Sequence, residues 1–188
     1  MNPLEEVLLG YTQGLFPMAD EGGGYSFYTA YPRAVLPLER FHCPARLARR
    51  LKSQPFELCR DRDFEGVIRG CADRASTWIS EEIIAIYSRL FERGFVRTVE
   101  AWKENRLVGG LYGVVLGGAF FGESMFHRAS DASKACVVHL VEHLRERGFG
   151  LLDCQQQSAH MQAFGSVLIS RREYHRQLAR ALKSECRW

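Results

Sequence analysis

The most constraining feature of this sequence is a pair of apolar, glycine-rich runs over residues 108–126, VGGLYGVVLGGAFFGESMF. The runs flank a turn at Gly117-Gly118 and predict a β-hairpin whose strands lie inside the molecule. Each glycine weakens a strand, so a strand keeps several of them where another backbone or a ligand comes close. The second run also holds one carboxylate, Glu123, and burying a charge is costly unless it is paired or used. The hairpin therefore predicts one wall of a binding site.

Length and composition suit one substantial core, or one domain with a small appendage. The chain has 188 residues, of which 46% are hydrophobic and 25% charged, and this is typical of a folded globular protein. The start, MNPLEEVLLG, lacks the basic and apolar regions of a signal peptide, and the longest uncharged run is too short to cross a bilayer. The six cysteines contain no CxxC pair, which indicates free thiols in a reducing compartment. We therefore expect a cytoplasmic protein without a membrane partner.

Basic residues are concentrated in two segments, although the formal net charge is only +3. Residues 40–62 hold seven basic and two acidic side chains, a net +5, and residues 171–188 hold six and two, a net +4. Within the first segment, Arg46, Arg49 and Arg50 share one face of a helix predicted from Cys43-Pro44 onward. Such clusters are typical of a polyanionic partner. Ordinary solvated helix faces explain them equally well, so charge alone leaves both interpretations open.

The remaining periodicity predicts an α+β fold with helices on a mostly antiparallel sheet. Besides the hairpin, strands are expected over residues 95–102 and 150–155, and residues 14–37 are expected to form a loop region. Helices are expected over residues 3–13, 63–72, 158–164 and 171–183. Two further helices are expected to begin at Thr77 or Ser80 and at Ser130 or Asp131, and to end at Gly94 and Gly148.

Two further features could carry chemistry. Asp153 and Gln155 lie two apart in the short strand LLDCQ and so point to the same face, with Cys154 on the other. A carboxylate beside an amide at a strand end can orient a nucleophile, whereas the alternative is a helix-capping aspartate and a surface glutamine. Trp78 precedes a helix, where it can stack on a base or simply join the core.

The sequence gives little support for several other kinds of active site. His139 and His143 have the i, i+4 spacing of metal ligands, but no third ligand is apparent, so no metal site is expected. The sequence has no Walker A loop and no GxGxxG, which leaves nucleotide hydrolysis and dinucleotide binding unsupported. It also has no nucleophile elbow of the serine-hydrolase type.

A set of short strings in a fixed order points to a known family. From Leu4 to Tyr174 the sequence holds GLFP (14–17), PRAVL (32–36), GCA (70–72), TWI (77–79), VGGLYGV (108–114), GESMF (122–126), ASK (132–134) and LDCQ (152–155), followed by His160. In these strings the chain resembles the leucyl/phenylalanyl-tRNA–protein transferases. The hairpin and LDCQ blocks are the most specific of the set.

The resemblance implies a fold and a reaction. Residues 41–188 would form an aminoacyltransferase domain of the GNAT acyltransferase type, with a mixed sheet flanked by helices. Residues 1–40 would be a shortened N-terminal helix-and-loop segment that packs on it. Members of the family transfer leucine, phenylalanine or methionine from aminoacyl-tRNA to the α-amino group of proteins that begin with Arg or Lys, and so mark them for N-end-rule degradation. We expect no cofactor, because the donor ester is already activated, and we expect a monomer.

The resemblance also implies residue roles. Gln155 would accept a hydrogen bond from the attacking amine, Asp153 would orient Gln155 or stabilise positive charge, and Glu123 would hold the amine or the acceptor's basic side chain. The donor side chain would enter an apolar pocket at Leu111, Phe120 and Leu140, with Phe121 and Tyr87 nearby. Trp78 would stack near the terminal adenine. The phosphates of the tRNA would meet Arg46, Arg49, Arg50 and Lys52.

Some positions depart from the family pattern, and two other functions compete. The family usually has a tryptophan where this chain has Met18, a Trp-Trp pair where it has Phe27-Tyr28, and an aromatic residue where it has Leu140. These differences affect the expected adenosine contacts and the donor preference. One alternative is an acyl-CoA-dependent N-acyltransferase of the same fold. The stretch HRASDASKAC lacks the glycines that usually cradle the CoA pyrophosphate, which disfavours this alternative. The other is a tRNA-binding module without activity.

Overall fold

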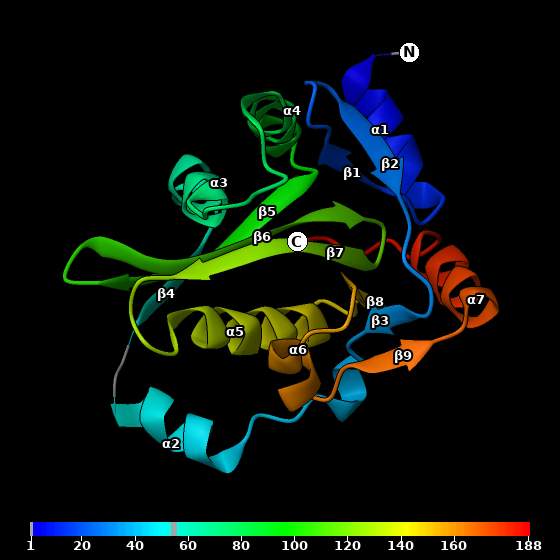
Figure 1. Cartoon of the computed structure of the whole chain (residues 1–188). Helices are drawn as coiled ribbons and strands as arrows, with labels where there is room; N and C mark the ends of the chain where they lie inside the picture. The colour runs from blue at the N-terminus through cyan, green and yellow to red at the C-terminus, as the bar shows by residue number, and fades with distance from the viewer. Residues whose placement is uncertain (1, 54–55) are drawn as a thin grey trace.

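The computed structural model describes residues 2–53 and 56–188, which form an α+β fold around two β-sheets (Figure 1). Within these residues, the smaller sheet pairs β1 (Phe16–Ala19) with β2 (Tyr25–Tyr28). The larger sheet has the strand order β4 (Glu57–Arg60), β5 (Val96–Lys103), β6 (Arg106–Leu116), β7 (Ala119–His127), β8 (Leu151–Gln155), β3 (Arg33–Val35) and β9 (Val167–Ile169). Strands β7 and β8 are parallel and the other neighbours antiparallel. The prediction of a mixed sheet flanked by helices is confirmed; the likeness to the GNAT type stays a prediction.

Helices cover both faces of the larger sheet (Figure 1). On one face lie α3 (Phe64–Ala72) and α4 (Glu81–Glu92), and on the other lies α5 (Ala132–Glu146), which connects β7 to β8. The others are α1 (Pro3–Thr12), α2 (Ala45–Ser53), α6 (Ala159–Ala163), α7 (Arg171–Ala181) and the 3-10 turn η1 (Leu38–Arg40). Among the described residues, no helix combines the length and apolar character needed to cross a bilayer. The sheet separates two cores, and alternation along β7 sends Phe121 into one and Phe120 into the other.

One of the two predicted helix caps, Ser80, is confirmed, and two further helices begin with a cap of the same kind. The side chains of Asp63, Ser80 and Ser158 accept hydrogen bonds from the first turns of α3, α4 and α6. Asp131 is the exception, because it stands at the start of α5 with a left-handed φ of 65° and caps no backbone N–H with its side chain. Its carboxylate binds Arg50 and Lys134 instead, so the predicted cap is wrong.

The loop predicted over residues 14–37 is also wrong, because this segment forms β1, β2 and β3. Strand β3 lies between β8 and β9 in the larger sheet, far from either of them in sequence. Such short strands carry little periodicity of their own, and β4 and β9 escape sequence analysis for the same reason. The proposed domain boundary at residue 40 stays a prediction, although β3 before it belongs to the larger sheet.

The predicted hairpin is confirmed as β6 and β7, but most of its glycines serve packing. A Cβ added at Gly109 would lie 2.6 Å from the Cβ of Ala132 at the start of α5, and one added at Gly110 would lie 2.8 Å from Val67 of α3. These glycines therefore let helices approach both faces of β6 closely. Gly122 of β7 lies beside the cavity described next.

Candidate active site

A cavity of about 420 Å³ opens between the sheet, α5, α6 and the segment that precedes α4. Leu111, Phe120 and Leu140, all predicted for the donor pocket, line it. Val137, Leu152 and Met161 add further apolar surface. A cavity of this size and lining suits one large apolar side chain together with part of a larger ligand.

Two other residues predicted for this pocket lie elsewhere. Phe121 points to the opposite face of β7, where its ring lies 5.0 Å from that of Tyr11, centroid to centroid. Tyr87 of α4 is also buried in that second core, and its hydroxyl donates a hydrogen bond of 3.1 Å to Glu123 Oε2. The two corrections have different reasons. Alternation along β7 turns Phe121 away from the face of Phe120, and Tyr87 belongs to α4, which covers the face of the sheet opposite α5 (Figure 1).

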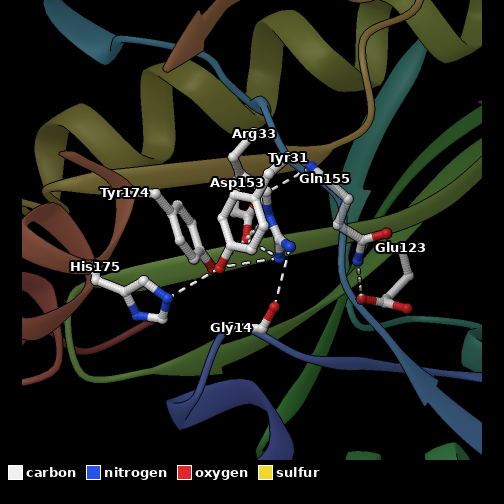
Figure 2. A network of polar contacts seen from close by, with 8 residues as sticks. All are labelled: Gly14, Tyr31, Arg33, Glu123, Asp153, Gln155, Tyr174 and His175. Carbon is white, nitrogen blue, oxygen red and sulfur yellow. Dashed lines mark hydrogen bonds and ion pairs between the residues drawn. The ribbon is translucent and has the colours of Figure 1, made fainter. Parts of the chain in front are cut away.

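Glu123 is the half-buried carboxylate at the polar end of the cavity. Its Oε1 accepts a 2.8 Å hydrogen bond from Gln155 Nε2 (Figure 2). On the other side, the hydroxyl of Tyr87 links Glu123 to the hydroxyl of Tyr11. Burial raises the pKa of Glu123 to about 7, against the opposing effect of the hydrogen bonds that it accepts. The carboxylate thus changes charge near neutral pH.

This raised pKa predicts that Glu123→Gln stabilises the protein at alkaline pH. A group whose pKa rises on folding favours the folded state at low pH, and this contribution is lost as pH rises through the folded pKa, here about 7. The variant escapes that loss, so its stability should exceed that of the unaltered chain by about 1–3 kcal/mol at pH 8 and not at pH 4. Urea denaturation at several pH values measures the difference. A difference that does not change with pH would contradict the assignment.

Asp153 is fully buried and holds the end of β8 in place. It accepts hydrogen bonds from Arg33 Nε at 2.9 Å and Nη2 at 2.7 Å, and from the Tyr174 hydroxyl at 2.7 Å (Figure 2). Its Oδ1 also accepts the backbone N–H of Gln155 at 2.8 Å. Gln155 has a left-handed φ of 59°, which is uncommon for a residue other than glycine. The carboxylate therefore positions Gln155 through its main chain, while the side chain of Gln155 turns to Glu123.

Arg33 completes this network and was not singled out from the sequence. Its guanidinium is fully buried, donates from Nη1 to the Gly14 carbonyl at 3.0 Å and stacks on the Tyr174 ring. Beyond Tyr174, the Tyr31 hydroxyl contacts His175 Nε2 at 2.9 Å (Figure 2). One signal was present in the sequence, because an aspartate in a buried strand requires a cation. Nothing local shows which arginine supplies it.

The remaining predicted site residues separate into two groups. Trp78 is half-buried and lines the cavity, as does Met18. Arg46, Arg49 and Lys52 are exposed on α2, whereas Arg50 pairs with Asp131 at 2.6 Å. Contact of these basic residues with tRNA stays a prediction.

The histidines with metal-like spacing have other neighbours. His139 Nε2 lies 3.2 Å from Arg60 Nη1, and the ring of His143 packs against Trp188 with a centroid separation of 4.6 Å. In residues 2–53 and 56–188, no three His, Cys, Asp or Glu side chains gather as a metal site.

The arrangement of Glu123 and Gln155 indicates which chemistry the site can support. Since the Glu123 carboxylate only accepts hydrogen bonds when ionised, it orients Gln155 with Nε2 toward itself. The carbonyl oxygen Oε1 then faces away, and within the described residues it has no hydrogen-bond partner. An acceptor fixed at the end of an apolar pocket suits a transferase that must seat a donor group beside an incoming amine.

Comparison with known proteins identifies the family within that class. The profile of the family described as leucyl/phenylalanyl-tRNA protein transferase matches residues 35–179. The chain belongs to this family.

Curated relatives match nearly the whole length of the chain in sequence. The leucyl/phenylalanyl-tRNA–protein transferase of Rubrobacter xylanophilus is 56% identical over 174 residues, 92% of this chain and 91% of the relative. That of Gloeobacter violaceus is 53% identical and covers 98% of this chain and 96% of the relative. Among solved structures, L-PGS from Bacillus licheniformis matches 93% of this chain and 61% of that one, with a TM-score of 0.45 and 11% identity, too low to support an argument.

Proposed function

We propose that this protein transfers leucine, phenylalanine or methionine from aminoacyl-tRNA to the N-terminal α-amino group of proteins that begin with Arg or Lys. Products of this reaction would be marked for N-end-rule degradation. Family membership supports the reaction class. The observation that carries the mechanism is the Gln155 carbonyl oxygen, which Glu123 and Asp153 hold at the polar end of an apolar cavity.

The proposed chemistry is attack of an amine on an activated ester. The amine has a solution pKa near ~8 and reacts only when neutral. Gln155 Oε1 accepts one N–H of the amine and so directs the nitrogen lone pair toward the ester carbonyl. The C–N bond forms as the bond to the ribose oxygen breaks, and that oxygen takes up the proton that the amine loses. Glu123 offers negative charge to the amine or to the basic first side chain of the acceptor.

In this mechanism Asp153 and Glu123 have different tasks. Asp153 is already neutralised by Arg33 and has no exposed surface, so it acts as a positioning residue through the backbone of Gln155. Glu123 lines the cavity and can meet the substrate directly.

The apolar part of the cavity would take the donor side chain. Leu111, Phe120 and Leu140 offer large hydrophobic surfaces without a polar group. A hydrophobic pocket separates side chains that differ by one or two methylene groups by only about 1–3 kcal/mol. The site therefore suits leucine, methionine and phenylalanine as donors and disfavours charged ones.

The adenosine and the tRNA body would lie further out. Trp78 would stack on the terminal adenine, and the exposed arginines of α2 would meet phosphates without reading sequence. We further propose that the chain acts as a monomer in the cytoplasm, and that residues 1–40 pack on the 41–188 domain.

The tRNA contact predicts a salt effect. The double substitution Arg46→Glu and Arg49→Glu should weaken tRNA binding and reduce the slope of log affinity against log salt by about 0.9 for each phosphate that α2 no longer neutralises. Arg50 is left unchanged because it holds Asp131. Binding titrations at several salt concentrations measure the slope, with the exposed Arg172→Glu on α7 as a control that reverses a charge elsewhere. An unchanged slope would remove α2 from the tRNA site.

The direct test is transfer of labelled leucine from Leu-tRNA to a peptide that begins with Arg. We expect transfer to this peptide, and loss of transfer when its α-amino group is acetylated. A matching peptide that begins with Ala tests the acceptor rule, and Phe-tRNA, Met-tRNA and Asp-tRNA test the donor pocket. Binding of Leu-tRNA without transfer would instead support a tRNA-binding module.

A further inference from the structure

A second cavity of about 380 Å³ adjoins the donor cavity, and the mechanism above leaves it unused. Its walls come from the end of α3, the end of β7, the start of α5 and His160 of α6. Arg74 and Met125 line both cavities, so the two are neighbours. Arg74 is fixed there, because its Nη2 donates to the Met125 carbonyl at 2.6 Å and to Ser124 Oγ at 3.2 Å.

The lining of this second cavity is basic. It presents the guanidinium groups of Arg74 and Arg128 and the imidazoles of His127 and His160, against the single carboxylate of Asp73 among its lining residues. Arg128 is exposed, lies over the Phe126 ring and donates only Nη1 to the protein, at 3.3 Å to the Leu107 carbonyl. Its other N–H groups can therefore donate to a ligand. Such a forked group is suited to phosphate oxygens.

His160 also indicates that this cavity binds a ligand. Its Nε2 atom is buried, yet within the described residues it has no hydrogen-bond partner. A buried polar atom without a partner is costly and is typical of a site that a ligand completes. Burial first, and then the nearby charges of Lys134 and His127, lower the pKa of His160, which favours the neutral imidazole with one N–H to donate.

The second cavity also borders the start of α5, which contacts the basic helix α2. The start of α5 borders it through Ser133, and there Asp131 joins Lys134 to Arg50 of α2. Figure 1 shows α2 near α5 on the same side of the larger sheet. Basic side chains therefore stand both at the second cavity, in Arg74 and Arg128, and on α2, whose Arg50 shares the Asp131 carboxylate with Lys134 of α5.

We propose that this second cavity binds the phosphodiester groups that precede the terminal adenosine of the donor tRNA. This inference rests on the proposed function, because it assumes that the adenosine and its aminoacyl group occupy the first cavity. A single strand leaving that cavity past Arg74 would place its phosphates against Arg128, His127 and His160. These contacts would guide the strand without reading its bases.

The test compares two unreactive donor analogues by calorimetry. One is adenosine with leucine joined to the 3′ position through an amide, and the other is the trinucleotide CCA with the same 3′ group. The unaltered chain should bind the trinucleotide about tenfold more tightly, and the gain should fall as salt increases. The double substitution His127→Gln and Arg128→Gln should bind both analogues with similar affinity. Arg128→Lys should keep part of the gain, and Arg172→Gln on α7 should keep all of it.

The outcomes separate this inference from the proposed function. Equal binding of both analogues by the unaltered chain, or a full gain in the double variant, would overturn the phosphate site. Failure to bind either analogue would overturn it as well. The phosphate site is tested by binding alone. If the unaltered chain binds the trinucleotide more tightly than the adenosine analogue but transfers no leucine to the peptide, the proposed function is contradicted and the phosphate site is not.

Discussion

Replacing Asp153 with asparagine is expected to lower turnover about 10²-fold while aminoacyl-tRNA affinity changes little. The carboxylate holds the backbone N–H of Gln155 and the guanidinium of Arg33 at once. An amide keeps only one acceptor oxygen, and its NH₂ group would face donors on the other side, either the Gln155 N–H or Arg33 Nη2 and the Tyr174 hydroxyl. The residues around it must then shift, and the Gln155 carbonyl oxygen moves relative to the amine. Displacement of a positioning group by about 1 Å can cost this much rate. Single-turnover transfer at saturating Leu-tRNA measures the effect.

Two controls make this result specific. Tyr174→Phe removes one hydrogen bond to Asp153 and keeps the ion pair, so it should lower turnover far less than Asp153→Asn. Binding of Leu-tRNA is measured in parallel for both variants. Reduced affinity together with normal turnover at saturation would show that Asp153 serves binding, and would contradict the positioning role.

Replacing Arg33 with methionine is expected to lower the free energy of unfolding by about 3–5 kcal/mol. The substitution leaves Asp153 buried without its cation, and removing one partner of a buried ion pair has this cost. It also leaves the Gly14 carbonyl without the hydrogen bond that Arg33 donates. Urea denaturation at pH 7 measures the change. A loss below about 1 kcal/mol would mean that the site rearranges to compensate.

The double variant Arg33→Met with Asp153→Leu separates stability from function. Replacing a buried pair by apolar side chains is often close to neutral, so much of the lost stability should return. The part that does not return reflects the groups that lose their partners, which are the Gly14 carbonyl, the Gln155 N–H and the Tyr174 hydroxyl. Transfer activity should stay low, because nothing then holds the backbone of Gln155. Recovery of activity together with stability would show that the pair serves only the fold.

Local patterns account for the parts of the fold that sequence analysis predicted. The hairpin of β6 and β7 follows from alternation around Gly117-Gly118, and the starts of α3, α4 and α6 follow from their capping side chains. These signals involve residues that are close in sequence, so no tertiary partner is needed to detect them. Phe121 failed as a pocket residue because a motif match does not take account of the face that a strand presents.

The strands that sequence analysis missed depend on distant partners. Strand β3 is three residues long and obtains its hydrogen bonds from β8 and β9. The same is true of Asp131, which has the pattern of a helix cap until Arg50 of α2 reaches its carboxylate. In both cases the stabilising group comes from far along the chain, where local propensity carries no information.

The sequence by itself determined the family motifs and the α+β order of most elements, and it predicted site roles for Glu123, Asp153 and Gln155 that stay predictions. Only the tertiary structure decided how they work together. It brought Arg33 across to neutralise Asp153, turned the Gln155 backbone onto that carboxylate and placed Glu123 against the Gln155 side chain. The physical reason is burial: a charge removed from water must find its partner wherever the fold supplies one, and that partner is set by strand pairing and not by neighbours in sequence.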